Sequence, residues 1–143
     1  MQKGITRTAT AVIAAVAAAT VFAHGDKAVP ALGPNGGEMK DAESYHLELV
    51  VKPQGVDVRE NPIVLYVTDA KDKKVDTAGA KGTANVLAGK IKATSTLQPD
   101  GDNRLKGIAK FAPDPEMKVV VSVTLPGKQP MQARFTPLAS SKK

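Results

Sequence analysis

The chain has 143 residues, and its 20 Lys and Arg against 14 Asp and Glu give a formal net charge of +6. The charges are interspersed, Trp is absent and other aromatic residues are few, so the composition argues against a nucleic-acid-binding protein. Cysteine is also absent, which excludes disulfides, thiolate zinc sites, iron–sulfur clusters and cysteine nucleophiles.

The N-terminus is predicted to be a cleavable export signal. Lys3 and Arg7 precede an apolar run over residues 9–22, and the small side chain of Ala23 marks the cleavage site. A membrane-spanning helix needs about 20 residues, and this run is shorter. A retained N-terminal anchor is therefore the less favoured alternative. We therefore expect residues 1–23 to be removed, leaving a periplasmic bacterial protein with no transmembrane segment.

The mature chain divides into three parts. Residues 24–37 are rich in Pro and Gly and are predicted to be a flexible lead-in. Residues 38–138 are predicted to form one β domain, and residues 139–143 a disordered tail. A domain of this size is held by its own core and needs no disulfides.

The domain is expected to be all-β because its apolar residues recur with a period of two. In residues 44–51, Tyr45, Leu47 and Leu49 fall on one face and His46 and Glu48 on the other. Further strands are predicted at 56–58, 63–67, 83–87, 91–97, 105–111, 117–125 and 132–136. About seven short strands separated by turns predict a small antiparallel β-sandwich of immunoglobulin-like type, with a small closed barrel as the alternative.

The sequence offers little for catalysis. The mature chain has only His24 and His46 as histidines, and it contains no G-x-S-x-G, no phosphate-binding loop before a helix and no H-E-x-x-H. Gly36-Gly37 precedes a strand rather than a helix, so it is predicted to be a turn and not a phosphate site. We expect the protein not to be an enzyme.

Metal binding is the chemistry that the histidines favour. After cleavage His24 is the first residue, and its α-amino and imidazole nitrogens can chelate one Cu(II) ion. His46 and Glu48 share the polar face of one strand, about 7 Å apart. His24, His46 and Glu48 are therefore the predicted ligands of Cu(II) or another divalent transition metal. The alternative is that His24 is an accident of cleavage and His46 an ordinary exposed strand residue.

Methionine adds a soft ligand type that suits Cu(I). The candidates are Met39, Met117 and Met131. Because Met117 and Met131 flank β segments, we expect both to fill the core.

Several motifs together resemble a small periplasmic domain linked to heavy-metal efflux, found at the front of adaptor subunits of resistance-nodulation-division pumps and in short stand-alone exported proteins. The motifs are Gly33-Pro34-Asn35-Gly36-Gly37, Tyr45-His46-Leu47-Glu48-Leu49-Val50-Val51, Leu65-Tyr66-Val67-Thr68-Asp69, Val75-Asp76-Thr77-Ala78-Gly79-Ala80, Leu105-Lys106-Gly107, Val123-Thr124-Leu125-Pro126-Gly127 and Ala133-Arg134-Phe135.

This resemblance implies an accessory role in copper or Co/Zn/Cd resistance, by binding a metal or by acting beside efflux pump components. It implies no ligand set. The chain lacks the helical hairpin and lipoyl-like segments of an adaptor, so it cannot be one itself. A looser resemblance, carried by His24 and the architecture, is to periplasmic copper carriers, although their methionine-rich loop is missing here.

A different class of function stays open. A metal-independent interaction module would dock on an envelope partner through an exposed sheet edge. The segment at Asn61-Pro62 and the lead-in to Gly37 are the predicted places for such docking.

Overall fold

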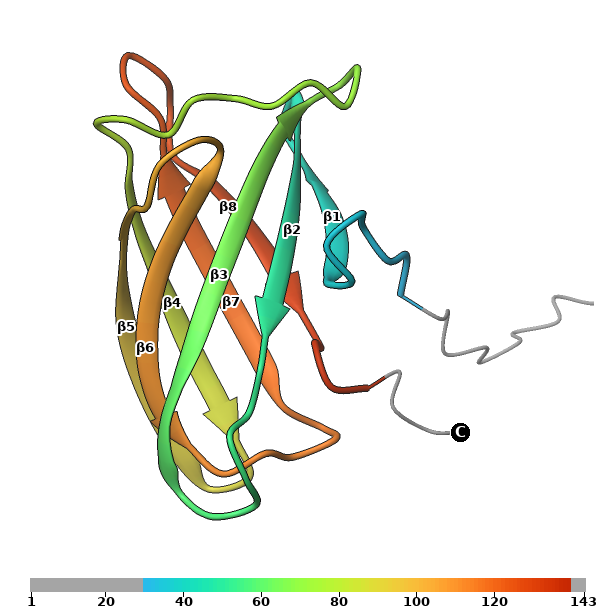
Figure 1. The fold of residues 1–143 in the computed structure, drawn as a ribbon, viewed down its shortest axis with the longest axis vertical. Helices are drawn as coiled ribbons and strands as arrows, with labels where there is room; N and C mark the ends of the chain where they lie inside the picture. Colours follow the sequence, from blue (N-terminus) through green and yellow to red (C-terminus); the bar gives the residue numbers. More distant parts are fainter. Residues whose placement is uncertain (1–29, 140–143) are drawn as a thin grey trace, which may run out of the picture.

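Eight β-strands make up the regular structure of residues 30–139, the part of the chain that the computed structural model describes (Figure 1). They are β1 (Glu38–Ala42), β2 (Tyr45–Val51), β3 (Arg59–Asp69), β4 (Lys81–Ala88), β5 (Ile91–Pro99), β6 (Arg104–Phe111), β7 (Lys118–Thr124) and β8 (Met131–Phe135). Every pairing is antiparallel, so the expected all-β antiparallel fold is confirmed, with eight strands rather than about seven. The predicted signal peptide and His24 lie outside the described residues.

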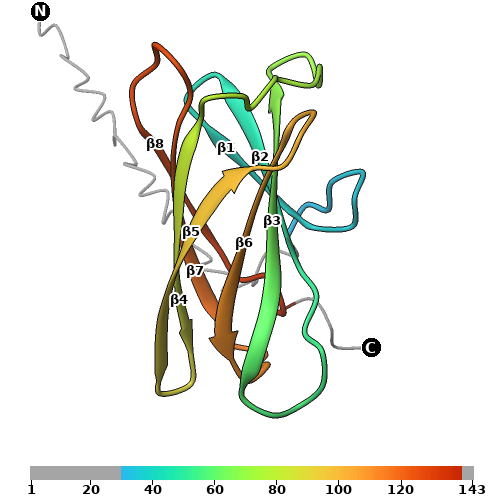
Figure 2. The ribbon, with the colours of Figure 1, turned by 60° about the vertical axis from the view of Figure 1, so that its left-hand side comes forward.

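The strands form one sheet in the order β1-β2-β3-β6-β5-β4-β7-β8. β5 pairs with β4 over most of its length but with β6 only at Gln98↔Lys106 and Pro99↔Leu105. Figure 2 shows β5 swinging from beside β4 towards β6. The sheet therefore folds into two halves, β1-β2-β3-β6 and β5-β4-β7-β8, that enclose the core between them.

The two ends of the sheet come together and make it nearly barrel-shaped. Glu38 on β1 is buried, and its Oε2 accepts a hydrogen bond of 2.6 Å from the backbone N–H of Thr136, just after β8. Its Oε1 lies 3.2 Å from the Lys40 ammonium. The architecture is thus intermediate between the predicted sandwich and the closed barrel that was its alternative.

The core follows the predicted two-residue alternation. In β4, exposed and buried residues alternate over the whole strand. The largest fully buried side chains include Phe111, Phe135, Leu47, Leu49, Ile63 and Leu65. Burying each such side chain is worth about 1.5–3 kcal/mol, so this layer supplies the main stabilisation of the fold. Met117 and Met131 are buried within it, which confirms that they fill the core.

The predicted strands at 56–58 and 63–67 leave Asn61-Pro62 as a break between them, which is wrong because both residues lie inside β3. Pro62 is tolerated there because β2 pairs with β3 only as far as Ile63, so at Pro62 the strand has β6 as its one neighbour. The side chain of Asn61 is buried and donates to the backbone carbonyls of Arg59 and Phe111. The strand predicted at 56–58 is also wrong, since these residues lie in the loop before β3.

The second half of the predicted flexible lead-in is hydrogen-bonded to the domain. Met39 donates its backbone N–H to Ala31 at 2.8 Å, and Gly33 donates to Gly37 at 2.9 Å. A Cβ atom on Gly37 would lie 2.4 Å from the carbonyl oxygen of Leu49, so only glycine fits this close approach. Residues 31–39 thus form a small hairpin, hereafter the N-terminal hairpin. No helix among residues 30–139 is long and apolar enough to cross a membrane.

Candidate functional site

The outer face of β1, β2, β3 and β6 carries the polar residues of the candidate site. Residues that pair directly across antiparallel strands point to the same face of a sheet. Asp41, His46 and Thr68 therefore form one row across β1, β2 and β3. Glu48 and Tyr66 begin a second row, which Arg104 on β6 extends.

A hollow of about 720 Å³ lies over this face. It is lined by Pro34, Asn35, Met39, His46, Glu48, Tyr66, Thr68, Asp72, Lys74, Asp102, Asn103 and Arg104. The sheet provides its floor, and the N-terminal hairpin and the turns after β3 and β5 provide its walls. The volume falls within the range of about 300–1,000 Å³ typical of small-molecule sites.

His46 lies at one end of the hollow between two carboxylates. Its Nδ1 is 2.7 Å from Oδ1 of Asp41, and its Nε2 is 3.8 Å from Oδ1 of Asp72. An ionised carboxylate only accepts hydrogen bonds, so the Nδ1 atom carries the hydrogen in the contact with Asp41. In the neutral imidazole this leaves the Nε2 lone pair directed towards Asp72.

Asp72 reaches His46 because a tight turn follows β3. The carboxylate of Asp69 accepts the backbone N–H groups of Lys71 at 2.8 Å and Lys73 at 3.0 Å. These hydrogen bonds hold the pKa of Asp69 below its ordinary value of 3.8, and the one from Lys73 has the larger effect. Asp72 itself has a φ of +59°, a conformation that Asp and Asn tolerate better than most residues. Asp69 thus shapes the turn that presents Asp72.

Glu48 does not face water as predicted. Glu48 is only 3% exposed, because the N-terminal hairpin folds over the polar face of β2. Its carboxylate accepts three hydrogen bonds, from the Asn35 backbone N–H at 2.8 Å, the Asn35 side-chain amide at 2.8 Å and the Gly37 N–H at 2.9 Å. The strand face was predicted correctly, but Glu48 anchors the hairpin rather than standing free beside His46.

The predicted metal ligands are therefore only partly brought together. Within residues 30–139, no three His, Asp or Glu side chains are grouped closely enough to hold a metal ion by themselves. His46 Nε2 and Asp72 Oδ1, 3.8 Å apart, are close enough to bind one ion together. His24 lies outside the described residues. Met39 is the one methionine of the three candidates that lines the hollow.

The other end of the hollow carries two cations, Lys74 and Arg104, each beside a carboxylate. The ammonium of Lys74 lies 2.7 Å from the carboxylate of Asp102, and its side chain is 68% exposed. The Arg104 guanidinium donates from Nη2 to the carbonyl of Asp100 at 2.9 Å. Its Nε N–H is buried and has no hydrogen-bond partner among the described residues. The sequence analysis predicted neither cation as part of a site.

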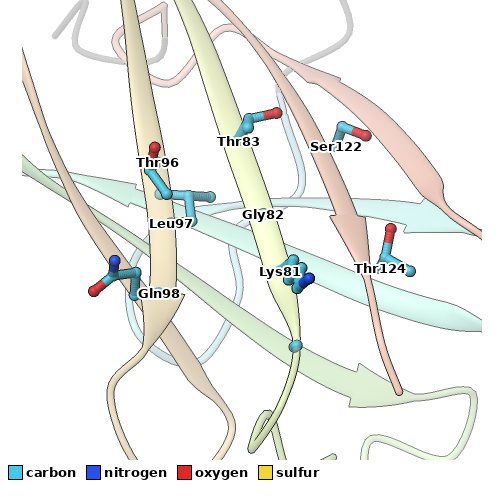
Figure 3. A pocket seen from close by; sticks show the side chains of 9 residues that line it. Lys81, Gly82, Thr83, Thr96, Leu97, Gln98, Ser122 and Thr124 are labelled. Atoms are coloured by element: carbon cyan, nitrogen blue, oxygen red, sulfur yellow. The ribbon is translucent and has the colours of Figure 1, made fainter. Parts of the chain in front are cut away.

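A second hollow, of about 390 Å³, lies over β4, β5 and β7 (Figure 3). Its polar lining consists of Lys81, Thr83, Thr96, Gln98, Ser122 and Thr124. In Figure 3 these side chains stand apart along three strands and do not converge on one point. None of its lining residues is a histidine or a carboxylate, so it is the weaker candidate for metal chemistry.

No protein-family model matches this chain, and no curated protein matches it. The functional argument therefore depends on the chemistry of the residues in the larger hollow.

Proposed function

We propose that this protein is a non-enzymatic, periplasmic accessory protein of heavy-metal resistance that binds Cu(II) or another divalent transition metal at His46. The observation that carries the proposal is the position of the imidazole, with Nδ1 hydrogen-bonded to Asp41 and Nε2 facing Asp72.

A carboxylate on the far nitrogen of a metal-binding histidine fixes the ring and its tautomer, and raises the basicity of the ligating nitrogen. Asp41 has this relation to His46 at 2.7 Å. Two ligand atoms that each lie about 2.0–2.2 Å from one ion can be up to about 4.2 Å apart. The separation of 3.8 Å between His46 Nε2 and Asp72 Oδ1 satisfies that limit.

The two residues alone make an incomplete coordination shell, and His24 is the proposed source of further nitrogens. As the first residue after cleavage it would offer an α-amino group and an imidazole. Pro30 is six positions further along the chain, a span of at most about 20 Å. Pro34 and Asn35, a few residues further on, line the hollow, so this reach is compatible with a shared site.

Copper is the favoured metal because the lining combines imidazole, carboxylate and thioether groups. Met39 adds a sulfur that suits Cu(I), while nitrogen and oxygen ligands suit Cu(II). The resemblance to the periplasmic domain of heavy-metal efflux adaptors supports the same physiological role, and efflux pump components are the proposed partners.

Calorimetric titration of the mature protein, beginning at His24, with Cu²⁺ tests the proposal. We expect one ion per chain and a loss of at least about tenfold in affinity for His46→Ala and for Asp72→Asn, each through the loss of one ligand. Asp57→Asn removes an equally exposed carboxylate in the loop before β3, at the opposite end of that strand from Thr68, the partner of His46, and should have no effect. Acetylating the terminal amine measures how much the α-amino group of His24 contributes to the Cu²⁺ affinity. Equal affinity in the wild type, His46→Ala and Asp72→Asn would refute the proposal.

A metal-independent interaction module is the second candidate, favoured by one feature of the sheet. β1 and β8 are its end strands and each pairs with one neighbour only, so each has one strand edge to which a partner strand could add. The predicted docking places fit less well, because Asn61-Pro62 pairs with β6 and Leu32 already forms a bridge to Glu38. A partner that is retained equally in a metal chelator and in added Cu²⁺ would favour this candidate.

A further inference from the structure

The larger hollow is much more spacious than a metal ion requires. Its volume is about 720 Å³, whereas one water molecule occupies about 30 Å³ in the liquid. His46 and Asp72 occupy one end of it. A bare ion bound there would leave most of the lined space, including Tyr66 and Arg104, without a ligand contact.

The remaining space leads to two cations. Arg104 lies on β6, two strands from His46 on β2, which corresponds to about 10 Å across the sheet. Tyr66 and Thr68 on β3 lie between them, on the same face. Lys74 lies beside Thr68, because the backbones of the two residues form an isolated antiparallel β-bridge. The hollow therefore has a metal-ligating end at His46 and an end that carries Lys74 and Arg104, each beside a carboxylate, Asp102 and Asp100 respectively.

Both cations keep capacity for a ligand. The Lys74–Asp102 pair is largely exposed, and exposed ion pairs are weak enough to exchange partners. The Arg104 guanidinium has five N–H donors. Among the described residues only its Nη2 donates a hydrogen bond, to the carbonyl of Asp100. The nearest carboxylate oxygen to it is that of Asp100, at 3.6 Å. A planar guanidinium with free donors matches a carboxylate group well.

From this arrangement we infer that the ligand is a divalent metal carried by a small anionic chelator with several carboxylate groups, bound with the metal at His46 and a free carboxylate at Arg104 and Lys74. The inference rests on the proposed function and specifies its substrate. It also explains the incomplete metal shell, because the chelator supplies the coordination that His46 and Asp72 do not.

The test compares three ligands of the mature protein by calorimetry: Cu²⁺ alone, Cu²⁺ with one equivalent of citrate, and Cu²⁺ with one equivalent of ethylenediamine. Citrate carries free carboxylates, whereas ethylenediamine chelates without any. We expect the citrate complex to bind at least about tenfold more tightly than the ethylenediamine complex, as an Arg–carboxylate contact of the charge-assisted kind predicts.

Variants assign this preference to the end that carries Lys74 and Arg104. Arg104→Gln should weaken the citrate complex by about tenfold and leave Cu²⁺ alone unchanged, and Lys74→Gln should act in the same direction but less strongly. Arg134→Gln, on the exposed side of β8, is the matched control. Lys74 is a side chain exposed at the surface, so its variant keeps the test valid even where Arg104→Gln perturbs folding.

The outcomes separate the two proposals. Equal binding of the citrate complex by wild type, Arg104→Gln and Lys74→Gln would overturn the inference, and so would release of free citrate when the protein takes up Cu²⁺. Binding of Cu²⁺ alone with no gain from citrate would refute the chelate and leave the metal site standing. Failure to bind copper in any form would refute the proposed function and the inference with it.

Discussion

The two outer faces of the sheet start from the same alternation of residues and end with different chemistry. Over β4, β5 and β7 the hydroxyl and amide side chains remain separate on an uncovered surface (Figure 3). Over β1, β2 and β3, the N-terminal hairpin brings N–H donors to the Glu48 carboxylate, and the turn after β3 brings the Asp72 carboxylate to His46. The difference teaches that a polar strand face becomes a site only where neighbouring loops close over it.

The largest effect should come from removing the anchor of the N-terminal hairpin. Glu48→Gln takes away a buried charge that accepts three hydrogen bonds, and hydrogen bonds to charged groups contribute about 1.5–3 kcal/mol each. We expect a loss of about 3 kcal/mol or more in the free energy of unfolding, measured in urea. Glu60→Gln, an exposed carboxylate on β3, is the control and should change stability by less than about 0.5 kcal/mol. A loss below about 1 kcal/mol for Glu48→Gln would show that the carboxylate does not anchor the hairpin.

The hairpin offers a second comparison between adjacent glycines. In Gly37→Ala the new methyl group meets the carbonyl of Leu49 at 2.4 Å, so the hairpin must move away from β2. Gly36→Ala meets nothing within 4 Å and carries only the strain of a φ of +78°, about 1–2 kcal/mol. Denaturant unfolding should rank Gly37→Ala as the more destabilised protein. The opposite ranking would contradict the close packing of the hairpin on β2.

One substitution on each outer face should show which face binds the metal. Neither substitution should change the stability of the protein. Asp72→Asn keeps a residue that tolerates positive φ and removes a ligand charge, so Cu²⁺ affinity should fall by about tenfold, or about 1.4 kcal/mol, at unchanged stability. Thr83→Val on the other face should leave Cu²⁺ affinity unaltered, because that hollow has no histidine or carboxylate in its lining. Equal losses in both variants would mean that the copper is bound non-specifically.

The smallest effect is the pH dependence contributed by Asp69. Its pKa is lowered in the folded protein by the backbone hydrogen bonds of Lys73 and Lys71, so its stabilising contribution is present above the ordinary pKa of 3.8 and is lost as the pH falls through the lower folded value. The stability difference between wild type and Asp69→Asn should therefore shrink on acidification below pH 3.8. Because Asp69 lies at the surface, next to the solvent-exposed turn after β3, the difference is modest. A difference that grows in acid would contradict the assignment.

Sequence periodicity was sufficient for the fold class and for the polar face of β2, because both depend on local alternation. It missed β1, although Glu43-Ser44 is a two-residue connection between the strands, with a φ of +53° at Glu43. Recognising that turn would have placed Asp41 opposite His46.

The rest of the site depends on contacts between distant parts of the chain. The burial of Glu48 depends on a hairpin whose residues precede it by 11 to 13 positions, and Asp72 and Arg104 approach the site through separate turns. Alternation within one strand carries no information about such contacts. For this reason Glu48 was assigned to solvent, while Asp41, Asp72 and Arg104 were overlooked.

The most direct test of the central claim is the ¹⁵N spectrum of the imidazole nitrogens, recorded before and after addition of Zn²⁺ as a diamagnetic substitute for Cu²⁺. The sequence has only two histidines, His24 and His46, so a His24→Ala variant assigns every signal. The account predicts that Nδ1 of His46 keeps its hydrogen and that Nε2 shifts on metal addition. Unchanged His46 signals at saturating Zn²⁺, or coordination through Nδ1, would contradict it.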